Sequence, residues 1–233
     1  LQEGNTAQLG FGDIDWYIRF GYRWDYQFRF RRIDFGVRAG ALFPTGQSRE
    51  LDRPASIPFG GNGHWGAYAQ LDLNLELKED WQCGFFLRTS KRFKKTANHR
   101  MPVNGEPQPF GIVCGPAEVD PGVTVVLCPW FLLENLRGGL GLGLNYTLTW
   151  HQKDSWCDKR ADQSVAVDLK PVEKTSKWAS DYFTINVLYD FGKVDQTAFR
   201  PLVYFRWDVP SSIFVADSVN KAQRVTLGLE FVY

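Results

Sequence analysis

The chain alternates between apolar and polar residues over long stretches. Between Asp13 and Trp24 every second residue is Ile, Phe, Tyr or Trp, whereas the positions between them hold Asp, Arg, Tyr or Gly. Successive side chains of a β-strand point to opposite faces, so this pattern predicts a strand with one apolar and one polar face. Seven more segments share the pattern: Ile33–Phe43, Trp65–Leu77, Trp81–Thr89, Leu140–Trp150, Phe183–Phe191, Val203–Val209 and Val225–Tyr233. A ninth, weaker segment, Val123–Glu134, is apolar on both faces and is interrupted by Pro129.

The lengths of these segments and of their connections indicate a membrane protein. Strands of soluble proteins most often have about five or six residues, whereas most of these segments have about ten to thirteen, as tilted membrane strands do. The short connections are Asp25–Arg31, Lys78–Asp80, Asn135–Gly138 and Lys193–Thr197. The long connections are Pro44–Gly63, Lys94–Gly122, Gln152–Lys177 and Pro210–Ala222. Short turns on one rim and long loops on the other are typical of an antiparallel up-and-down transmembrane β-barrel.

Two features indicate which face meets the lipid. Tryptophans lie near the ends of the apolar stripes, at Trp24, Trp65, Trp81 and Trp150, with Trp130, Trp178 and Trp207 close by. Indoles favour the boundary between lipid and water. The polar face carries arginines but no lysine, and guanidinium groups pair well with carboxylates in confined spaces.

We therefore expect the apolar face to point outward and the polar face to line a lumen. The expected lumen residues are Arg19, Arg23, Arg32, Asp34, Arg38, Asp72, Glu76, Arg88, Arg92, Arg206, Asp208, Arg224 and Glu230. The alternative interpretation is a solvated sheet face that happens to lack lysine.

The last eight residues carry a further signal. From Thr226 to Tyr233 they run polar, any, Gly, any, any, aromatic, any, aromatic, and the final aromatic residue closes an apolar stripe. On this spacing, and on the strand pattern over nearly the whole chain, the sequence resembles the bacterial outer-membrane β-barrel superfamily. The resemblance implies a place in the bacterial outer membrane, in contact with its lipid. It also implies recognition by the barrel assembly machinery through Thr226, Gly228, Phe231 and Tyr233. Porins, fatty-acid-transporter-like channels and autotransporter barrels all remain open as subfamilies.

The number of strands does not fit a closed barrel of that superfamily. Its single-chain barrels nearly always have an even number of strands and both termini in the periplasm, whereas nine strands would start outside. We therefore expect residues 1–233 to form a single β-barrel domain that lacks its N-terminal strand or strands, with ten or more strands in the complete protein. A miscount at Val123–Glu134 is the competing explanation. The polar stretch Leu1 to Gln8 is no signal peptide, which predicts a mature or trimmed chain.

Charge, hydropathy and cysteine content exclude several other classes of protein. The net charge of +1 argues against a nucleic-acid partner. No apolar run approaches the roughly 18 residues of a membrane-spanning helix. The four cysteines, Cys83, Cys114, Cys128 and Cys157, form no CxxC pair and have no histidine cluster nearby, so we expect neither a metal nor a cofactor. Cys114 and Cys128 either bridge a loop or act as small buried hydrophobic residues.

A porin-like passive channel for small hydrophilic solutes is the function that this pattern favours. The Lys94–Gly122 connection would fold into the lumen and narrow it beside a mixed lining of arginines and carboxylates. A structural or surface-interaction barrel filled by ion pairs is the alternative, followed by a hydrophobic-substrate channel or an autotransporter-type translocator. Enzymatic activity is not expected. His151, with Asp154 nearby, is interpreted as a solvated histidine at the rim. The sequence leaves the solute and the oligomeric state open.

Overall fold

All nine segments predicted as strands are strands in the computed structural model, and together they make one antiparallel sheet. The structure describes residues 9–26, 29–53, 56, 58–106, 111–191, 200–211, 213 and 223–232. The strands of the sheet are β1 (Ile14–Asp25), β2 (Arg32–Phe43), β3 (Gly66–Lys78), β4 (Trp81–Arg92), β7 (Val123–Arg137), β8 (Leu140–His151), β10 (Trp178–Asp190), β11 (Arg200–Ser211) and β12 (Arg224–Val232). The chain is therefore all-β, as the alternation predicted.

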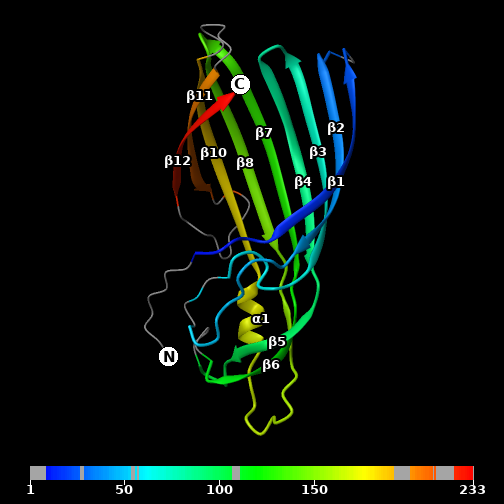
Figure 1. The fold of residues 1–233 in the computed structure, drawn as a ribbon, viewed down its shortest axis with the longest axis vertical. Coiled ribbons are helices and arrows are strands. Elements are labelled where there is room, and N and C mark those ends of the chain that lie inside the picture. The colour runs from blue at the N-terminus through cyan, green and yellow to red at the C-terminus, as the bar shows by residue number, and fades with distance from the viewer. Residues whose placement is uncertain are drawn as a thin grey trace.

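The nine strands follow one another through the sheet in chain order, so each is antiparallel to its neighbours. The pairing is regular: in the first hairpin it runs without a shift from Ile14 opposite Phe43 to Asp25 opposite Arg32. Figure 1 shows that the sheet curls strongly along its width. Within the described residues β1 and β12 are its two edges and each pairs with one neighbour.

The weakest predicted strand, β7, accommodates Pro129 inside the sheet. Its ladder with β8 pairs Leu127 with Leu148 and resumes at Trp130 with Asn145, so the pairing is interrupted where proline lacks an N–H group. The register on the two sides of the gap is the same. The long strand therefore continues past the proline without a change of face.

The long connections at one end of the sheet are more ordered than expected. They contain β5 (Lys95–Met101), β6 (Val113–Asp120) and β9 (Ser155–Asp158), which form a second, three-stranded antiparallel sheet, and the helix α1 (Lys170–Ser176). The sequence indicated only long connections here, because these short strands mix Lys, Asn, Pro and Cys and lack a period of two. We call these elements, with the described part of residues 44–65, the cap.

The cap lies beyond one end of the nine-stranded sheet (Figure 1). The Lys94–Gly122 connection, which we expected to fold into a lumen, instead supplies β5 and β6 to the three-stranded sheet of the cap. It is held there because β6 pairs with both β5 and β9, and the apolar side chains of Met101, Ala117 and Val119 are buried. The helix α1 has seven residues, and no helix in the described ranges is long and apolar enough to cross a membrane.

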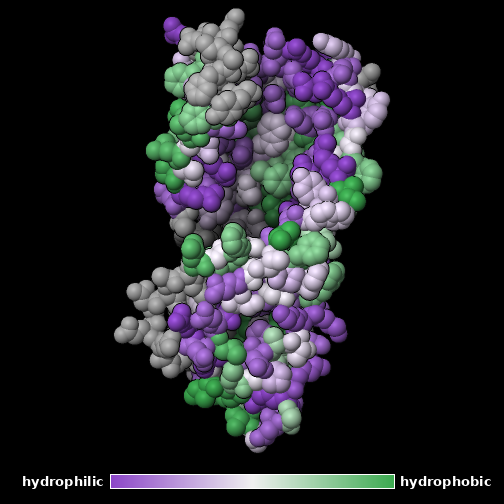
Figure 2. All heavy atoms as spheres, viewed as in Figure 1, coloured by the Kyte–Doolittle hydropathy of each residue, from purple (hydrophilic) through white to green (hydrophobic). Residues whose placement is uncertain are grey.

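In most strands of the large sheet the polar side chains are less exposed than the apolar ones, whereas every residue of the edge strand β1 is exposed. In β11, Val203, Phe205 and Trp207 are exposed, whereas Asp208, which follows Trp207 and points to the opposite face, is only 4% exposed. In β12, Leu227 is 75% exposed. Figure 2 shows hydrophobic side chains along the outer flanks of the sheet. This arrangement is the reverse of that in a soluble protein, where the apolar face of a sheet is covered.

Candidate functional site on the concave face

The polar face of the sheet is its concave face. Arg88 of β4 donates a hydrogen bond to Asp15 of β1 over 3.0 Å, although β2 and β3 lie between these strands. In a flat sheet, three inter-strand spacings would separate the two backbones by about 14 Å, which is too far for these side chains to meet. The contact therefore requires the sheet to bend toward its polar face.

One group of ionic contacts lies on β1 to β4, and Asp72 is at its centre. Asp72 accepts hydrogen bonds from Arg19 at 2.6 Å and from Arg38 at 3.2 Å, and Arg19 also donates to Asp34 at 2.7 Å. Gly36 makes room for this group, because a Cβ atom there would lie 2.5 Å from both Arg19 and Asp72. Two guanidinium groups and two carboxylates thus balance in charge across three neighbouring strands.

Arginines of this group also lie over tyrosine rings. The guanidinium carbon of Arg88 lies 3.7 Å from the centre of the Tyr68 ring, and that of Arg38 lies 5.3 Å from the Tyr17 ring. Such cation–π contacts hold a guanidinium plane against a rigid surface. The arginines of β2 and β4 are therefore fixed in position by rings as well as by carboxylates.

A second group lies on β10 to β12 and is centred on Asp208. This buried carboxylate accepts hydrogen bonds from Arg224 Nε at 2.7 Å, Arg206 Nε at 2.9 Å and Thr184 Oγ1 at 2.7 Å. Two cations share one carboxylate, so this group carries a net positive charge. The polar contacts of the concave face thus fall on two flanks of the curved sheet.

Other predicted lumen residues lie nearer the ends of the strands. Arg32 pairs with Glu76 over 2.9 Å beside the short turns, and Arg23 pairs with Asp25 over 3.0 Å, both of the latter being exposed. Glu230 is exposed in β12. The structure therefore brings the predicted residues together in pairs and small groups rather than in one continuous ring.

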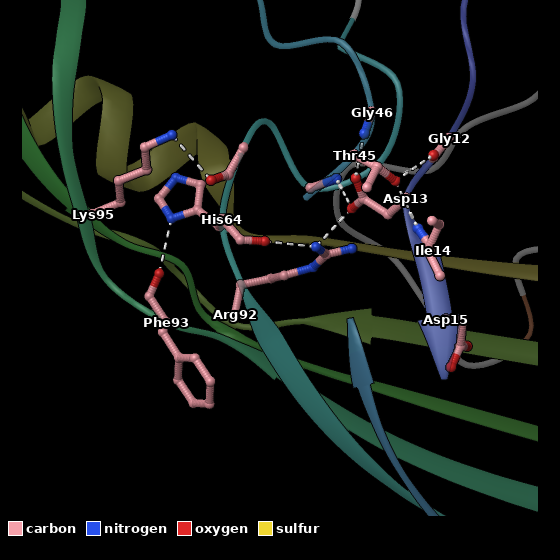
Figure 3. A network of polar contacts seen from close by, with 12 residues as sticks. Gly12, Asp13, Ile14, Asp15, Thr45, Gly46, His64, Arg92, Phe93 and Lys95 are labelled. Carbon is pink, nitrogen blue, oxygen red and sulfur yellow. Dashed lines mark hydrogen bonds and ion pairs between the residues drawn. The ribbon is translucent and has the colours of Figure 1, made fainter. Parts of the chain in front are cut away.

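Arg92 occupies a junction between the sheet and the cap (Figure 3). Asp13, only 6% of whose side chain is exposed, accepts hydrogen bonds from the backbone amides of Gly46 at 3.0 Å and Gly61 at 2.7 Å and pairs with Arg92 Nη1 at 2.7 Å. Arg92 also donates to the carbonyl oxygen of His64 at 2.8 Å. We call this contact set the Asp13 clamp. Arg92 was expected in the lumen, and its place in this clamp could not be predicted because Gly46, Gly61 and His64 belong to a connection with no periodic pattern.

The charge state of Asp13 follows from these contacts. Burial by itself would raise the pKa of the carboxyl group. The hydrogen bonds from the amides of Gly61 and Gly46, and the hydrogen bond and positive charge of Arg92, outweigh burial and hold the pKa of Asp13 below its ordinary value. The clamp is therefore ionised at neutral pH.

His151 makes a second junction between the sheet and a long connection. Its Nε2 lies 3.0 Å from Asp154 Oδ1, and its Nδ1 lies 2.7 Å from the hydroxyl oxygen of Thr124. The same Asp154 oxygen accepts a hydrogen bond from the amide of Gly122 at 2.7 Å. The contact with Thr124 could not be predicted from the sequence because Thr124 belongs to the neighbouring strand β7. These contacts join the ends of β7 and β8 to the start of the cap segment.

No protein-family model and no curated protein matches the chain.

The convex face carries two bands of exposed aromatic residues. Trp16, Trp65 and Trp150 lie toward the cap, and Trp24, Trp81, Phe191 and Phe231 lie toward the short turns. Between Trp16 and Trp24, residue steps of about 3.3 Å along a strand tilted by about 40° correspond to a height of about 20 Å. The residues between the bands are mainly Ile, Leu, Val and Phe.

Two of the predicted interface tryptophans do not belong to these bands. Trp178 lies an even number of residues from the polar residues of β10, so it belongs to the polar face, and its ring stacks on that of His151 with 5.6 Å between ring centres. Trp130 lies over Gly84 on the concave face, because a Cβ atom at Gly84 would come within 2.9 Å of its ring. Trp130 and Trp178 were misassigned because an indole near a strand end fits either face when only the sequence is considered.

The proposed assembly signal lies on β12. Phe231 is exposed on the convex face, and Thr226 has the opposite parity. Gly228 has a local structural role, because a Cβ atom there would overlap the ring of Tyr204 on β11. Tyr233 lies outside the described residues.

The cysteines are all free thiols. Cys128 is buried in β7, whereas Cys114 is exposed in β6, so the bridge between them that the sequence left open does not form. Among the described residues, no group of three or more His, Cys, Asp or Glu side chains has the arrangement of a metal site.

Proposed function

We propose that the chain forms the wall of a transmembrane β-barrel in the bacterial outer membrane. The observation that carries the proposal is the reversed polarity of the large sheet, with ion pairs on the concave face and apolar side chains on the convex face. Lipid is the solvent that makes such a convex face favourable, and two aromatic bands flanking an apolar zone match the interfaces of a bilayer.

Closure of the barrel is part of this proposal. An open sheet edge in lipid leaves backbone N–H and C=O groups without partners, which costs several kcal/mol for each group. The outer edges of β1 and β12 carry such groups. They are satisfied either by pairing with each other or by pairing with further strands.

We further propose that the barrel is a porin-like passive channel for small hydrophilic solutes. The ionic groups centred on Asp72 and Asp208 lie on opposite flanks, and Figure 2 shows the surface hollowed between the two edges of the sheet. On β8, Gly141 and Gly143 add no side chains to this face, and Leu188 and Asn186 of β10 lie close to them. Fixed charges on facing walls of a water-filled path select ions by their charge and create a transverse field.

A barrel with a filled lumen is the second candidate. The observation in its favour is the contact from Arg88 to Asp15, which crosses two intervening strands, together with the Tyr68 ring beneath Arg88. These side chains occupy space on the β1 to β4 flank. If the other flank is occupied in the same way, the protein is a structural or surface-interaction barrel and conducts no solute.

Planar-bilayer recording distinguishes the two candidates. The substitution Arg38→Glu changes the charge of the concave face by two units, so an open channel should shift its ion preference toward cations. Arg137→Glu, at an exposed position beside a short turn, makes the same charge change away from the two ionic groups and is the matched control. A wild-type protein without steady conductance, or equal shifts in the two variants, would contradict the channel.

A further inference from the structure

The cap contains a cavity of about 160 Å³ that belongs neither to the concave face nor to the Asp13 clamp. Residues 48–51, the strand β5, Trp156 of β9 and Val172 of α1 all contribute to its wall. Segments from all three cap connections therefore enclose it. Its volume is close to that of an engineered cavity of about 150 Å³ that holds benzene.

Three cations line this cavity. They are Arg49, Lys95 and Arg100, and each donates to backbone carbonyl oxygens: Arg49 to Ser56 at 3.2 Å, Lys95 to Gly63 at 3.0 Å and Arg100 to Leu51. The lining includes one carboxylate, Glu50, which faces Arg53 over 3.4 Å. The wall therefore carries an excess of positive charge.

Two residues that line this cavity each have a buried ring nitrogen with no hydrogen-bond partner among the described residues. The two atoms are Nε2 of His99 and Nε1 of Trp156, and the two rings meet edge to face with 4.9 Å between their centres. The indole N–H group can only donate. Buried polar atoms without partners are rare in native proteins, and an acceptor atom inside the cavity would satisfy this one.

The charge state of His99 reflects the same surroundings. Burial, followed by the nearby His64, Arg49 and Lys95, lowers the pKa of His99 to about 4. The imidazole is therefore neutral at neutral pH, and a bound anion would favour its protonation.

We propose that this cavity binds a small organic anion, a carboxylate or phosphate group carried by a compact apolar or aromatic body. The acidic group lies among Arg49, Lys95 and Arg100 and accepts from Trp156 Nε1. The body lies against the apolar side chains that complete the wall, namely Leu51, Ala97, Pro102 and Val172. Guanidinium groups suit both acids because they donate in a planar fork. The proposal does not depend on the channel, because the cavity lies within the cap.

The test uses the full chain labelled with ¹⁵N-tryptophan in detergent micelles. The indole signal of Trp156, one of nine tryptophans, is assigned with the variant Trp156→Phe. Benzoate and phenyl phosphate are titrated in separate experiments, and benzamide serves as the uncharged ligand of similar shape. We expect a saturable shift of the Trp156 signal with at least one of the two anions, and an affinity for benzamide at least tenfold lower.

Two variants test the cations. Lys95→Gln and Arg100→Gln should each weaken anion binding several-fold, whereas Lys94→Gln should not, because Lys94 is exposed and faces Glu118 instead. The indole signals of the other tryptophans report whether each variant keeps the native fold. Three results would overturn the proposal: no saturable shift with either anion, equal binding of benzamide, or unchanged binding in folded Lys95→Gln.

Discussion

The Asp13 clamp offers the most direct test of how the cap is held on the sheet. Replacement of Asp13 by Ala removes the acceptor for the amides of Gly46 and Gly61 and the partner of Arg92. Each backbone amide left without an acceptor costs about 1–3 kcal/mol. Loss of a partner also leaves the half-buried guanidinium uncompensated. We expect a total loss of about 3–5 kcal/mol of local stability.

Amide hydrogen exchange measures this loss directly. A local destabilisation of about 3 kcal/mol should speed the exchange of the Gly46 and Gly61 amides by roughly a hundredfold. Asp25→Ala is the matched control, since Asp25 pairs with Arg23 at an exposed site and should contribute less than about 1 kcal/mol. If Asp13→Ala exchanged no faster than Asp25→Ala, the clamp would have no structural role.

The clamp should also depend on pH with a defined sign. Because the pKa of Asp13 is lowered in the folded protein, its stabilising contribution is complete above the ordinary value of 3.8 and is lost as the pH falls through the lower folded value. Protection of the Gly61 amide should therefore persist at pH 5 and decline only below about pH 4. A decline centred near pH 6 would point to a histidine instead.

Three further outcomes are expected. Because the pKa of His99 is lowered in the folded protein, this imidazole is protonated in the unfolded cap at a higher pH than in the folded cap. The stability of the cap should therefore fall by about 1–2 kcal/mol between pH 6.5 and pH 4, after allowance for partial exposure. Urea titrations at the two pH values measure this fall, and the variant His99→Asn should lack it. Leu229 is 57% exposed on the convex face, so a cysteine in the variant Leu229→Cys should be shielded by lipid from aqueous thiol reagents in membranes, whereas the cysteine of Thr226→Cys should react. Equal labelling of the two variants would contradict an apolar face that points outward. Phe231→Ser should reduce the amount of protein in the outer membrane. A normal amount of this variant in the outer membrane would contradict the proposed assembly signal.

The strands of the large sheet could be read from the sequence because period two is a local property. Between Asp13 and Trp24, the alternation of adjacent residues is enough to show which side of the strand is apolar, and the same holds for the other segments. Even the weak segment with Pro129 became a strand, since its flanking strands supply the pairing. The cap strands had no such signal, because β5 and β6 are stabilised by pairing and by the buried Met101 rather than by alternation.

Charge partners were decided by the tertiary structure alone. The sequence indicated that Arg19, Asp72 and Arg88 share a face, but the curvature of the sheet determines that Arg19 meets Asp72 and that Arg88 reaches Asp15 across two strands. The cavity of the cap has the same origin, because its wall combines residues from three connections that are distant in the chain. Parity along a strand depends on neighbours in sequence, whereas ion pairs and cavities depend on distances between strands, and those distances exist only once the sheet has curved and the cap has folded.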